Sequence, residues 1–225
     1  MESRKTSILL PSAYRANHLA RCLDALTSTL DDNPIELLIS CVEDDAQSIG
    51  VAQRYQPALL HVRTFAEYKR GFIWILNELA RRSTGAVIAV MADDLICWDH
   101  WLTNCLALLD DRGGFVGFND LYTDGNVYAA HFVVSRSFLR DVMGGVLFPP
   151  QYYCWWCDRE ISDKAQMAGR YVWAQNALVE HAHYSFGKAQ IDRTYAEALP
   201  YHEQDRLLYQ ARKAANFPID YEAVL

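Results

Sequence analysis

Short apolar runs of strand character alternate with segments of helical periodicity through the first 110 residues of the chain. We expect strands over the ranges Thr6 to Leu10, Ile35 to Val42, Leu59 to Thr64 and Ala86 to Met91. The segments between them predict helices over Ala46 to Tyr55, capped by Asp45, over Gly71 to Arg82, and along a face formed by Leu19, Cys22, Leu23, Leu26 and Leu30. This alternation predicts an α/β protein with a mainly parallel central sheet flanked by helices.

The pattern changes after residue 110 and indicates a mixed sheet. Strands are expected over Phe115 to Phe118 and Val127 to Ser135, with a turn at Thr123 to Asn126 between them. A helix over Cys157 to Ala168, a strand near Val179 to His183 and a helix over Tyr201 to Asn216 are expected to follow. Because no linker or repeat interrupts the 225 residues, we expect one domain with two halves, residues 1–110 and 111–225.

The composition argues against several classes of protein. With 21 Lys and Arg against 28 Asp and Glu, the net charge of −7 argues against a broad basic surface for nucleic acid. The longest apolar run, Ala86 to Ala92, is too short to span a bilayer, and the N-terminus lacks the pattern of a secretory signal. We therefore expect a cytoplasmic protein without a transmembrane segment, in which the six cysteines are reduced.

Acidic residues collect where the expected parallel strands end. Glu43, Asp44 and Asp45 follow the second strand, and Asp93 and Asp94 follow the fourth. Ligands bind at this edge of an open parallel sheet. Two adjacent carboxylates repel each other unless a cation or a helix N-terminus receives them, so the pair predicts either a site for Mg²⁺ or Mn²⁺ or a helix cap.

Two histidines form a second candidate group. His181 and His183 lie two residues apart on an expected strand, so both imidazoles project from the same face. They fit a shared ligand or metal ion, and they equally fit hydrogen-bonded structural residues.

An aromatic run, Tyr152 to Trp156, leads into a helix that is expected to start near Asp158. Asp158 fits a helix cap, and it also fits a general base beside an aromatic wall that would bind a sugar. Cys154 and Cys157 form one C-x-x-C pair, which lacks the second pair of a structural zinc site.

The order of these pieces resembles the GT-A nucleotide-diphosphosugar glycosyltransferases of family 2. The segment Pro11 to Arg15 is similar to the family's P-T-Y-N-R loop, with one extra residue before Tyr14. The segment Asp44 to Ser48 resembles the D-D-x-S segment that binds the nucleoside, and Gly71 to Asn77 resembles the G-x-x-x-x-x-N helix. The D-x-D motif has its counterpart in Ala92, Asp93 and Asp94, where the first acid is missing.

Later motifs extend the resemblance to about residue 190. The family's E-D-x-E-L helix, whose second acid is the catalytic base, resembles Cys157 to Ile161, with Cys157 in place of the first glutamate. The family strand that ends in a metal-binding histidine resembles Val179 to His183. The resemblance implies a GT-A, Rossmann-like fold over nearly the whole chain.

The resemblance also implies an activity and its residues. The chain would move a sugar from a nucleoside diphosphate donor, a UDP-sugar first, to an acceptor hydroxyl, with inversion and with Mn²⁺ or Mg²⁺ as a Lewis acid. Asp158 would be the base with Glu160 as its back-up, and the metal ligands would be Asp94, His181 and His183. The donor-binding residues would be Pro11, Tyr14, Arg15, Asp44, Asp45, Arg70, Asn77 and Asp93, with Asp44 or Asp45 on the nucleobase. Trp155 and Trp156 would bind the acceptor.

A saccharide is the first expectation for the acceptor, and a protein or a modified nucleic-acid base are alternatives. Two other functions stay open. A nucleotidyltransferase would also use carboxylate-bound Mg²⁺, although Pro11 to Arg15 lacks the glycine of its usual loop. A degenerate sugar-nucleotide-binding protein without catalysis would account for the missing first acid and for Cys157 in place of glutamate.

Overall fold

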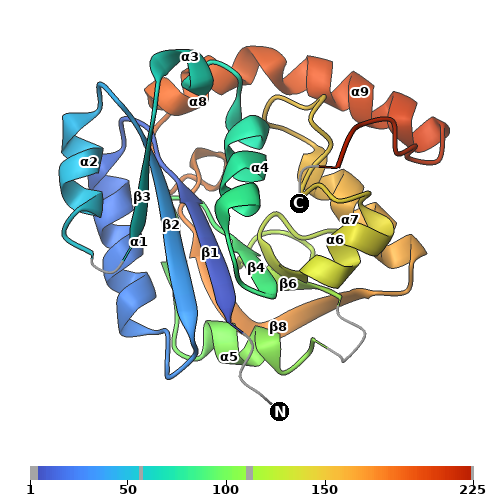
Figure 1. Ribbon diagram of the computed structural model, residues 1–225, viewed down its shortest axis with the longest axis horizontal. Helices are drawn as coiled ribbons and strands as arrows, with labels where there is room; N and C mark the ends of the chain where they lie inside the picture. The colour runs from blue at the N-terminus through green and yellow to red at the C-terminus, as the bar shows by residue number, and fades with distance from the viewer. Residues whose placement is uncertain (1–4, 56–57, 110–113, 224–225) are drawn as a thin grey trace.

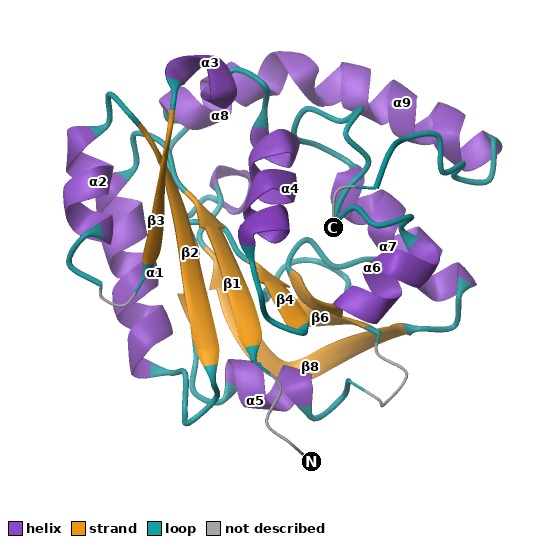
Figure 2. Ribbon diagram, in the orientation of Figure 1, coloured by secondary structure: helices purple, strands orange, loops and turns teal. Residues whose placement is uncertain are grey.

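One sheet runs through the molecule with helices on both of its faces (Figure 1, Figure 2). The computed structural model describes residues 5–55, 58–109 and 114–223, so the expected boundary between residues 110 and 111 lies outside the described residues. Four parallel strands form one side of the sheet in the order β3-β2-β1-β4. They are β1 (Thr6–Pro11), β2 (Ile35–Val42), β3 (Leu59–Arg63) and β4 (Val87–Val90), each within one residue of the prediction at either end.

The other side of the sheet is mixed, as predicted. β7 (Phe132–Ser135) pairs antiparallel with β4 and with β6 (Phe115–Asn119). β8 (Tyr171–His181) runs parallel to β6, and the short β5 (Leu95–Cys97) pairs antiparallel with β8. This topology brings the ends of β1, β4 and β8 to the same region, although β8 is more than 80 residues away from β4 in sequence.

Two apolar clusters cover the two faces of the sheet. The first lies under α1 (Ala16–Ser28), α2 (Ala46–Ala52) and α5 (Trp101–Leu106). The second lies under α4 (Phe72–Arg82), α6 (Arg136–Val142) and α7 (Cys157–Met167). Three further helices, α3 (Phe65–Tyr68), α8 (Arg193–Ala198) and α9 (His202–Ala214), lie along the edge where the parallel strands end (Figure 1). Two short 3₁₀ turns, Tyr184–Phe186 and Leu199–Tyr201, complete the described elements.

The structure departs from the predicted elements in several places. The predicted first helix ends at Ser28, so Leu30 lies outside it, and α2 ends at Ala52 instead of Tyr55. β8 begins at Tyr171, eight residues before the expected strand. The elements β5, α3, α5, α6 and α8 were not expected, because each is seven residues or shorter and carries little periodicity.

Residues 127–131, which were expected to be part of a strand, form a turn and a loop before β7. The Asp120 carboxylate accepts hydrogen bonds from the backbone N–H groups of Tyr122 and Thr123, and the Tyr171 hydroxyl donates to the Gly125 carbonyl. These side chains hold the segment in a shape that strand pairing would not allow.

All six cysteines are unpaired, and five of them are buried. No helix among the described residues has the length and apolar character needed to cross a membrane.

Candidate active site

A hollow lies beyond the ends of β1 and β4, where α4, α7, α8 and the end of β8 converge. It comprises three adjoining cavities. The first is lined by residues that include Pro11, Ser12, Arg15, Arg63, Tyr68 and Asp93. The second is lined by residues that include Arg15, Asp94, His131, Asp158, His181 and His183. The third shares Trp155, Trp156, Asp158, His181 and His183 with the second and adds residues that include Tyr128, Arg159 and His202.

Arg15 is the group that separates the two adjacent aspartates. It lies between β1 and α1, and its Nη1 is 2.7 Å from Asp93 Oδ1 while its Nη2 is 3.4 Å from Asp94 Oδ2. All three side chains are buried. Burial alone would lower the pKa of Arg15, but the charges of the two carboxylates outweigh it and raise the pKa. Two adjacent carboxylates repel each other unless a positive charge lies beside them. Arg15 supplies part of that charge.

The two aspartates differ in their surroundings. Burial raises the pKa of Asp93, and its like-charged neighbour Asp94 adds to that rise although Arg15 opposes it. Asp93 Oδ2 also accepts a hydrogen bond from the Ser12 hydroxyl at 2.7 Å. Burial would also raise the pKa of Asp94, but His181 and Arg15 beside it lower the pKa instead. Asp94 is therefore the carboxylate that stays charged and is available to a cation.

The chain after β8 closes over this pair. Tyr195 of α8 donates a hydrogen bond from its hydroxyl to Asp94 Oδ2, and Arg15 Nε is 2.7 Å from Asp192 Oδ2. The Arg15 guanidinium also lies over the Tyr195 ring, 4.3 Å from its centroid. Thr194 and Tyr195 thereby become part of the wall of the hollow.

The end of β8 brings His181 to the hollow, and His183, two residues beyond the end of the strand, also lines it. His181 Nε2 is 3.4 Å from Asp94 Oδ1, and the rings of His181 and His183 are 4.9 Å apart. The His183 Nδ1 atom accepts a hydrogen bond from the Ser185 backbone N–H at 3.2 Å. Burial and the charge of His181 lower the pKa of His183 to about 4, so this ring is neutral at physiological pH.

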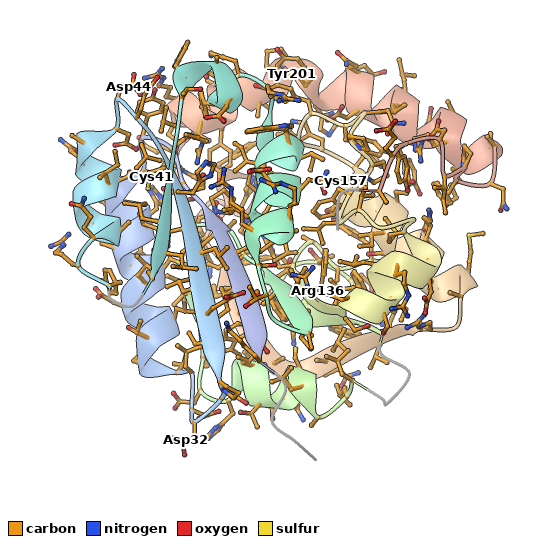
Figure 3. The ribbon with its side chains drawn as sticks, viewed as in Figure 1. Asp32, Cys41, Asp44, Arg136, Cys157 and Tyr201 are labelled. Atoms are coloured by element: carbon orange, nitrogen blue, oxygen red, sulfur yellow. The ribbon has the colours of Figure 1, made fainter. Side chains whose placement is uncertain are left out.

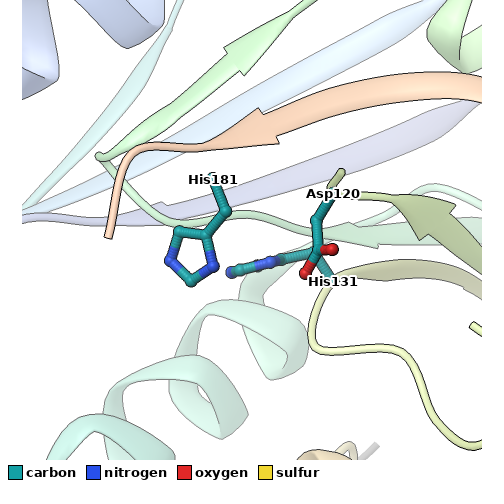
Figure 4. A group of neighbouring side chains, drawn as sticks. All are labelled: Asp120, His131 and His181. Carbon is teal, nitrogen blue, oxygen red and sulfur yellow. The ribbon is translucent and has the colours of Figure 1, made fainter. Parts of the chain in front are cut away.

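Two residues that the sequence analysis missed stand next to His181. His131 precedes β7 and Asp120 follows β6, and one ligand atom from each lies within 4.8 Å of the others and of a ligand atom of His181 (Figure 4). Burial and the charge of His181 lower the pKa of His131 to about 3. Neither residue belongs to a local sequence motif. The fold alone brings the loop that contains Asp120 and the loop that contains His131 to the end of β8.

Asp158 opens α7 and lines the second and third cavities. Its Oδ1 accepts a hydrogen bond from the backbone N–H of Arg159 at 2.8 Å. Burial raises the pKa of Asp158 to about 6 despite that bond and the Arg159 charge. A carboxylate with such a pKa is ionised at neutral pH yet is a stronger base than a solvent-exposed one.

The turn before Asp158 is held in an uncommon shape. Trp156 has φ of 66°, a left-handed conformation that costs a non-glycine residue roughly 1–2 kcal/mol. The Asp205 carboxylate of α9, which is fully buried, accepts hydrogen bonds from the backbone N–H groups of Tyr153, Cys154 and Trp155. The Trp155 indole N–H donates to the Ala198 carbonyl at 2.9 Å. These contacts fix the aromatic run against the opening of α7.

Several predicted site residues have other tasks in the structure. Glu160 lies on the opposite side of α7 from the hollow, where it is fully buried and forms an ion pair with Arg212 at 2.9 Å. Asn77 binds the backbone of Leu147 and Phe148 through both side-chain atoms. Both side chains are engaged in the core, so a back-up base at Glu160 and a donor contact at Asn77 stay predictions that these contacts do not favour.

Arg70, Asp44 and Asp45 also make other contacts, and their predicted roles in donor binding stay predictions. The Arg70 guanidinium lies over the Trp74 ring, 4.4 Å from its centroid, and does not line the hollow. Asp45 accepts hydrogen bonds from the backbone N–H groups of Tyr14 and Ser48 and caps α2. Asp44 lies beyond β2 near the outer edge of the molecule and accepts a hydrogen bond from the Tyr14 hydroxyl at 2.6 Å (Figure 3). Tyr14 therefore contacts Asp44 and Asp45 and is not among the residues that line the three cavities.

The donor set at the end of β8 fits a divalent cation. The Asp94 Oδ1 and His131 Nδ1 atoms are buried and have no hydrogen-bond partner within the described part of the chain. Carboxylate oxygens suit Mn²⁺ and Mg²⁺, and imidazole nitrogens suit transition-metal ions. The group is therefore chemically able to hold a metal.

The family model for glycosyl transferase family 2 matches residues 7–195 of the chain. No curated protein matches the sequence significantly.

Solved structures share the fold at low sequence identity. The mannosyltransferase PcManGT from Pyrobaculum calidifontis, solved with GDP-Man and Mn²⁺, has 18% identity and a TM-score of 0.69, over 99% of this chain and 66% of its own. Glucosyl-3-phosphoglycerate synthase from Mycobacterium tuberculosis, solved with Mn²⁺, UDP and glucosyl-3-phosphoglycerate, has 11% identity and a TM-score of 0.64, over 96% of this chain and 82% of its own. S. aureus TarS 1–349, solved with UDP-GlcNAc, has 13% identity and a TM-score of 0.63, over 95% of this chain and 71% of its own.

Proposed function

The chain belongs to glycosyl transferase family 2, and from this premise we propose that it transfers a sugar from a nucleoside diphosphate donor to an acceptor hydroxyl with inversion at the anomeric carbon. The observation that carries the proposal is that Asp94, Asp158 and His181 line one cavity. A charged carboxylate beside an imidazole and a carboxyl group of raised pKa are the two chemical parts that such a transfer needs.

The donor would occupy the first two cavities. The first holds Pro11, Ser12 and Asp93 at its wall, and Arg15 is shared with the second. The Arg15 guanidinium would attract the diphosphate, because it is charged at every accessible pH and lies beside the cavity that holds Asp94. UDP-sugars are the first donors to test, since solved relatives of this fold carry UDP or UDP-GlcNAc, and GDP-sugars come next because another carries GDP-Man.

A divalent cation held by Asp94 and His181 would offset the negative charge that builds on the departing diphosphate, a Lewis-acid role that needs no separate proton donor. Mn²⁺ is the first ion to test because it is present in two of the solved relatives. His183, the other predicted ligand, has its Nδ1 engaged with Ser185 and would contribute through its other nitrogen only.

Asp158 would act as the general base. Its carboxylate lines both the second and the third cavity, so an acceptor in the third cavity would reach it from the side opposite the donor. The acceptor hydroxyl must approach to about 3 Å for its proton to pass to Asp158 during the attack. Direct attack by one acceptor, with no intermediate on the protein, inverts the anomeric centre.

The third cavity favours a saccharide acceptor. It has two indole rings, Trp155 and Trp156, and the Tyr128 ring, over which the Arg159 guanidinium lies at 4.7 Å. Flat aromatic faces bind the apolar faces of sugar rings, and the guanidinium and His202 can donate to sugar hydroxyls or to an acidic substituent.

The test is a donor and acceptor panel. The chain is incubated with UDP- and GDP-sugars, Mn²⁺ and mono- or oligosaccharides, and the released nucleoside diphosphate is measured. Release that depends on an acceptor and is abolished in Asp158→Asn supports the proposal, and NMR of the product anomer tests the inversion. Donor binding without any release would identify a binding protein, and pyrophosphate released from nucleoside triphosphates would identify a nucleotidyltransferase.

A further inference from the structure

We propose that this chain holds its divalent cation with a histidine-rich set, His131 and His181 together with Asp120 and Asp94, in place of a site built on adjacent aspartates. The inference rests on the proposed function for its purpose, since the ion would be the one beside the donor diphosphate. It differs from the site expected from sequence in two of its four ligands, Asp120 and His131.

The first support is the closeness of donor atoms that come from separate elements. Ligand atoms of Asp120, His131 and His181 all lie within 4.8 Å of one another, and Asp94 Oδ1 is 3.4 Å from His181 Nε2. Two ligands that are each about 2.1 Å from an ion lie at most about 4.2 Å apart. Side-chain shifts of a few tenths of an ångström would therefore suffice for an ion to reach Asp120, His131 and His181, and Asp94 lies beside His181 as the fourth proposed ligand.

The second support is independent of distance. His131 and Asp94 are more than nine-tenths buried, and each has an atom, Nδ1 of His131 and Oδ1 of Asp94, without a hydrogen-bond partner among the described residues. Buried polar atoms normally find a partner, and an unpartnered one calls for an explanation such as an ion. His131 belongs to the group with Asp120 and His181, and Asp94 lies next to that group, 3.4 Å from His181.

The third support is the way the rings are arranged. The His131 and His181 rings meet edge to face with centroids 4.7 Å apart, and the Asp120 carboxylate lies alongside (Figure 4). Asp120 is held in place by the backbone N–H groups of Tyr122 and Thr123 and by the Thr123 hydroxyl. A carboxylate fixed in this way is suited either to bind the ion or to orient the imidazole beside it.

Arg15 explains why the adjacent aspartates are a poor site on their own. Asp93 is engaged by Arg15 and Ser12, and Asp94 Oδ2 is engaged by Arg15 and Tyr195. Only Asp94 Oδ1 stays free of hydrogen bonds, and it faces His181. With one free oxygen from the pair, the remaining ligands have to come from elsewhere, and His131 and His181 line the same cavity as Asp94.

This donor set has consequences for metal choice. Imidazole suits Zn²⁺, Fe²⁺ and Ni²⁺ best and binds Mn²⁺ more weakly, whereas Mg²⁺ demands oxygen ligands in near-ideal octahedral geometry and gives up its water reluctantly. A site with three or four protein ligands would also bind the ion without help from a nucleotide. We therefore expect one Mn²⁺ to bind the full chain alone, with at least about tenfold higher affinity than Mg²⁺.

The experiment is a titration of the full chain with Mn²⁺ in the absence of nucleotide. The electron paramagnetic resonance signal of free Mn²⁺ measures how much of the ion is bound at each step. His131→Gln and Asp120→Asn should each weaken binding by about tenfold or more. His61→Gln, a substitution of a half-buried histidine on β3, is the matched control and should leave binding unchanged. Electron spin-echo measurements on the unmutated chain should show nitrogen couplings from two imidazoles, so the result does not depend on the folding of a variant.

Either of two results would overturn the inference: no Mn²⁺ binding without nucleotide, or wild-type affinity in a folded His131→Gln chain. Failure of the proposed function looks different. If Mn²⁺ binds with two nitrogen couplings but no donor is turned over, the metal site stands and the transferase proposal falls. If sugar is transferred with a metal response that His131→Gln leaves intact, the transferase proposal stands and the histidine site falls.

Discussion

Arg15 and Asp93 form a buried ion pair in which Nη1 and Oδ1 are 2.7 Å apart. The same guanidinium also contacts Asp94 and Asp192, so one cation from the loop after β1 serves three carboxylates, two from the turn after β4 and one from the chain after β8. Arg15 therefore links three separate segments of the chain at the site.

Arg15→Ala should destabilise the protein by about 3 kcal/mol, because removal of one partner leaves buried charge without compensation. The loss should be larger at pH 8 than at pH 5. Without Arg15 the pKa of Asp93 rises further, so the carboxyl group is neutral at low pH and must be buried as a charge at high pH. Urea unfolding at the two pH values measures this, and Arg21→Ala on the exposed face of α1 should show no such trend.

Asp158→Asn should lower kcat/KM by about 10²- to 10⁴-fold, the usual contribution of a general base, while donor affinity stays near the wild-type value. Nucleoside diphosphate release and thermal shifts with UDP measure the two quantities. Asp163→Asn is the matched control, because Asp163 is on the same helix but contacts Tyr209 and Lys213 outside the hollow. Equal losses in both variants would remove Asp158 from its role.

The rate should rise with pH through a value near 6. Asp158 must be ionised to accept a proton, and its pKa is about 6, so below that pH kcat/KM should fall about tenfold per unit. His131 and His183 have pKa values of about 3 and about 4, so neither changes charge in this range. A profile of kcat/KM that is flat between about pH 5 and pH 7 would contradict the assignment.

Glu160→Gln should affect stability and not chemistry. The Glu160 carboxylate binds Arg212 and accepts a hydrogen bond from the Tyr152 hydroxyl, and loss of its charge leaves a buried guanidinium. We expect a loss of about 3 kcal/mol in the free energy of unfolding. Turnover per folded molecule, measured at a temperature where the variant is native, should stay within about twofold of the wild type, unlike that of Asp158→Asn.

Asp205→Ala should loosen the aromatic run. The change leaves three backbone N–H groups without their acceptor, at about 1 kcal/mol each. Because Trp155 lines the third cavity, KM for the acceptor should rise while the donor affinity is kept. Glu203→Ala on the exposed face of α9 is the control and should alter neither quantity. A change in donor affinity alone would be inconsistent with this role for Asp205.

The strands β1, β2 and β4 could be predicted closely, because their sequences are mostly apolar and their residues are mostly buried. The first half of β8 could not, since only Ala174 among residues 171–176 is buried and the segment contains polar side chains. Short elements such as β5 and α5 are positioned by their neighbours and leave no periodic pattern of their own.

The candidate site could be predicted where a motif sits directly at the end of a long element. Asp94 and His181 follow this rule, and the topology brings them together. Asp158 and Glu160 look equivalent in sequence, but two residues correspond to about 200° around a helix, so one faces the hollow and the other faces α9. Asp120 and His131 lie in loops and meet only through the pairing of β6 with β7.

The bond between Arg15 and Asp192 joins residues 177 positions apart, and Tyr195 and Asp205 reach the site from the same late segment. Contacts that span so much chain form slowly, because a large loop must close first. During synthesis on the ribosome, all strands of the sheet would emerge before residues 192–205, which complete the pocket. We expect a nascent chain that has not yet released residues 192–205 to be folded in its centre but unable to retain substrate.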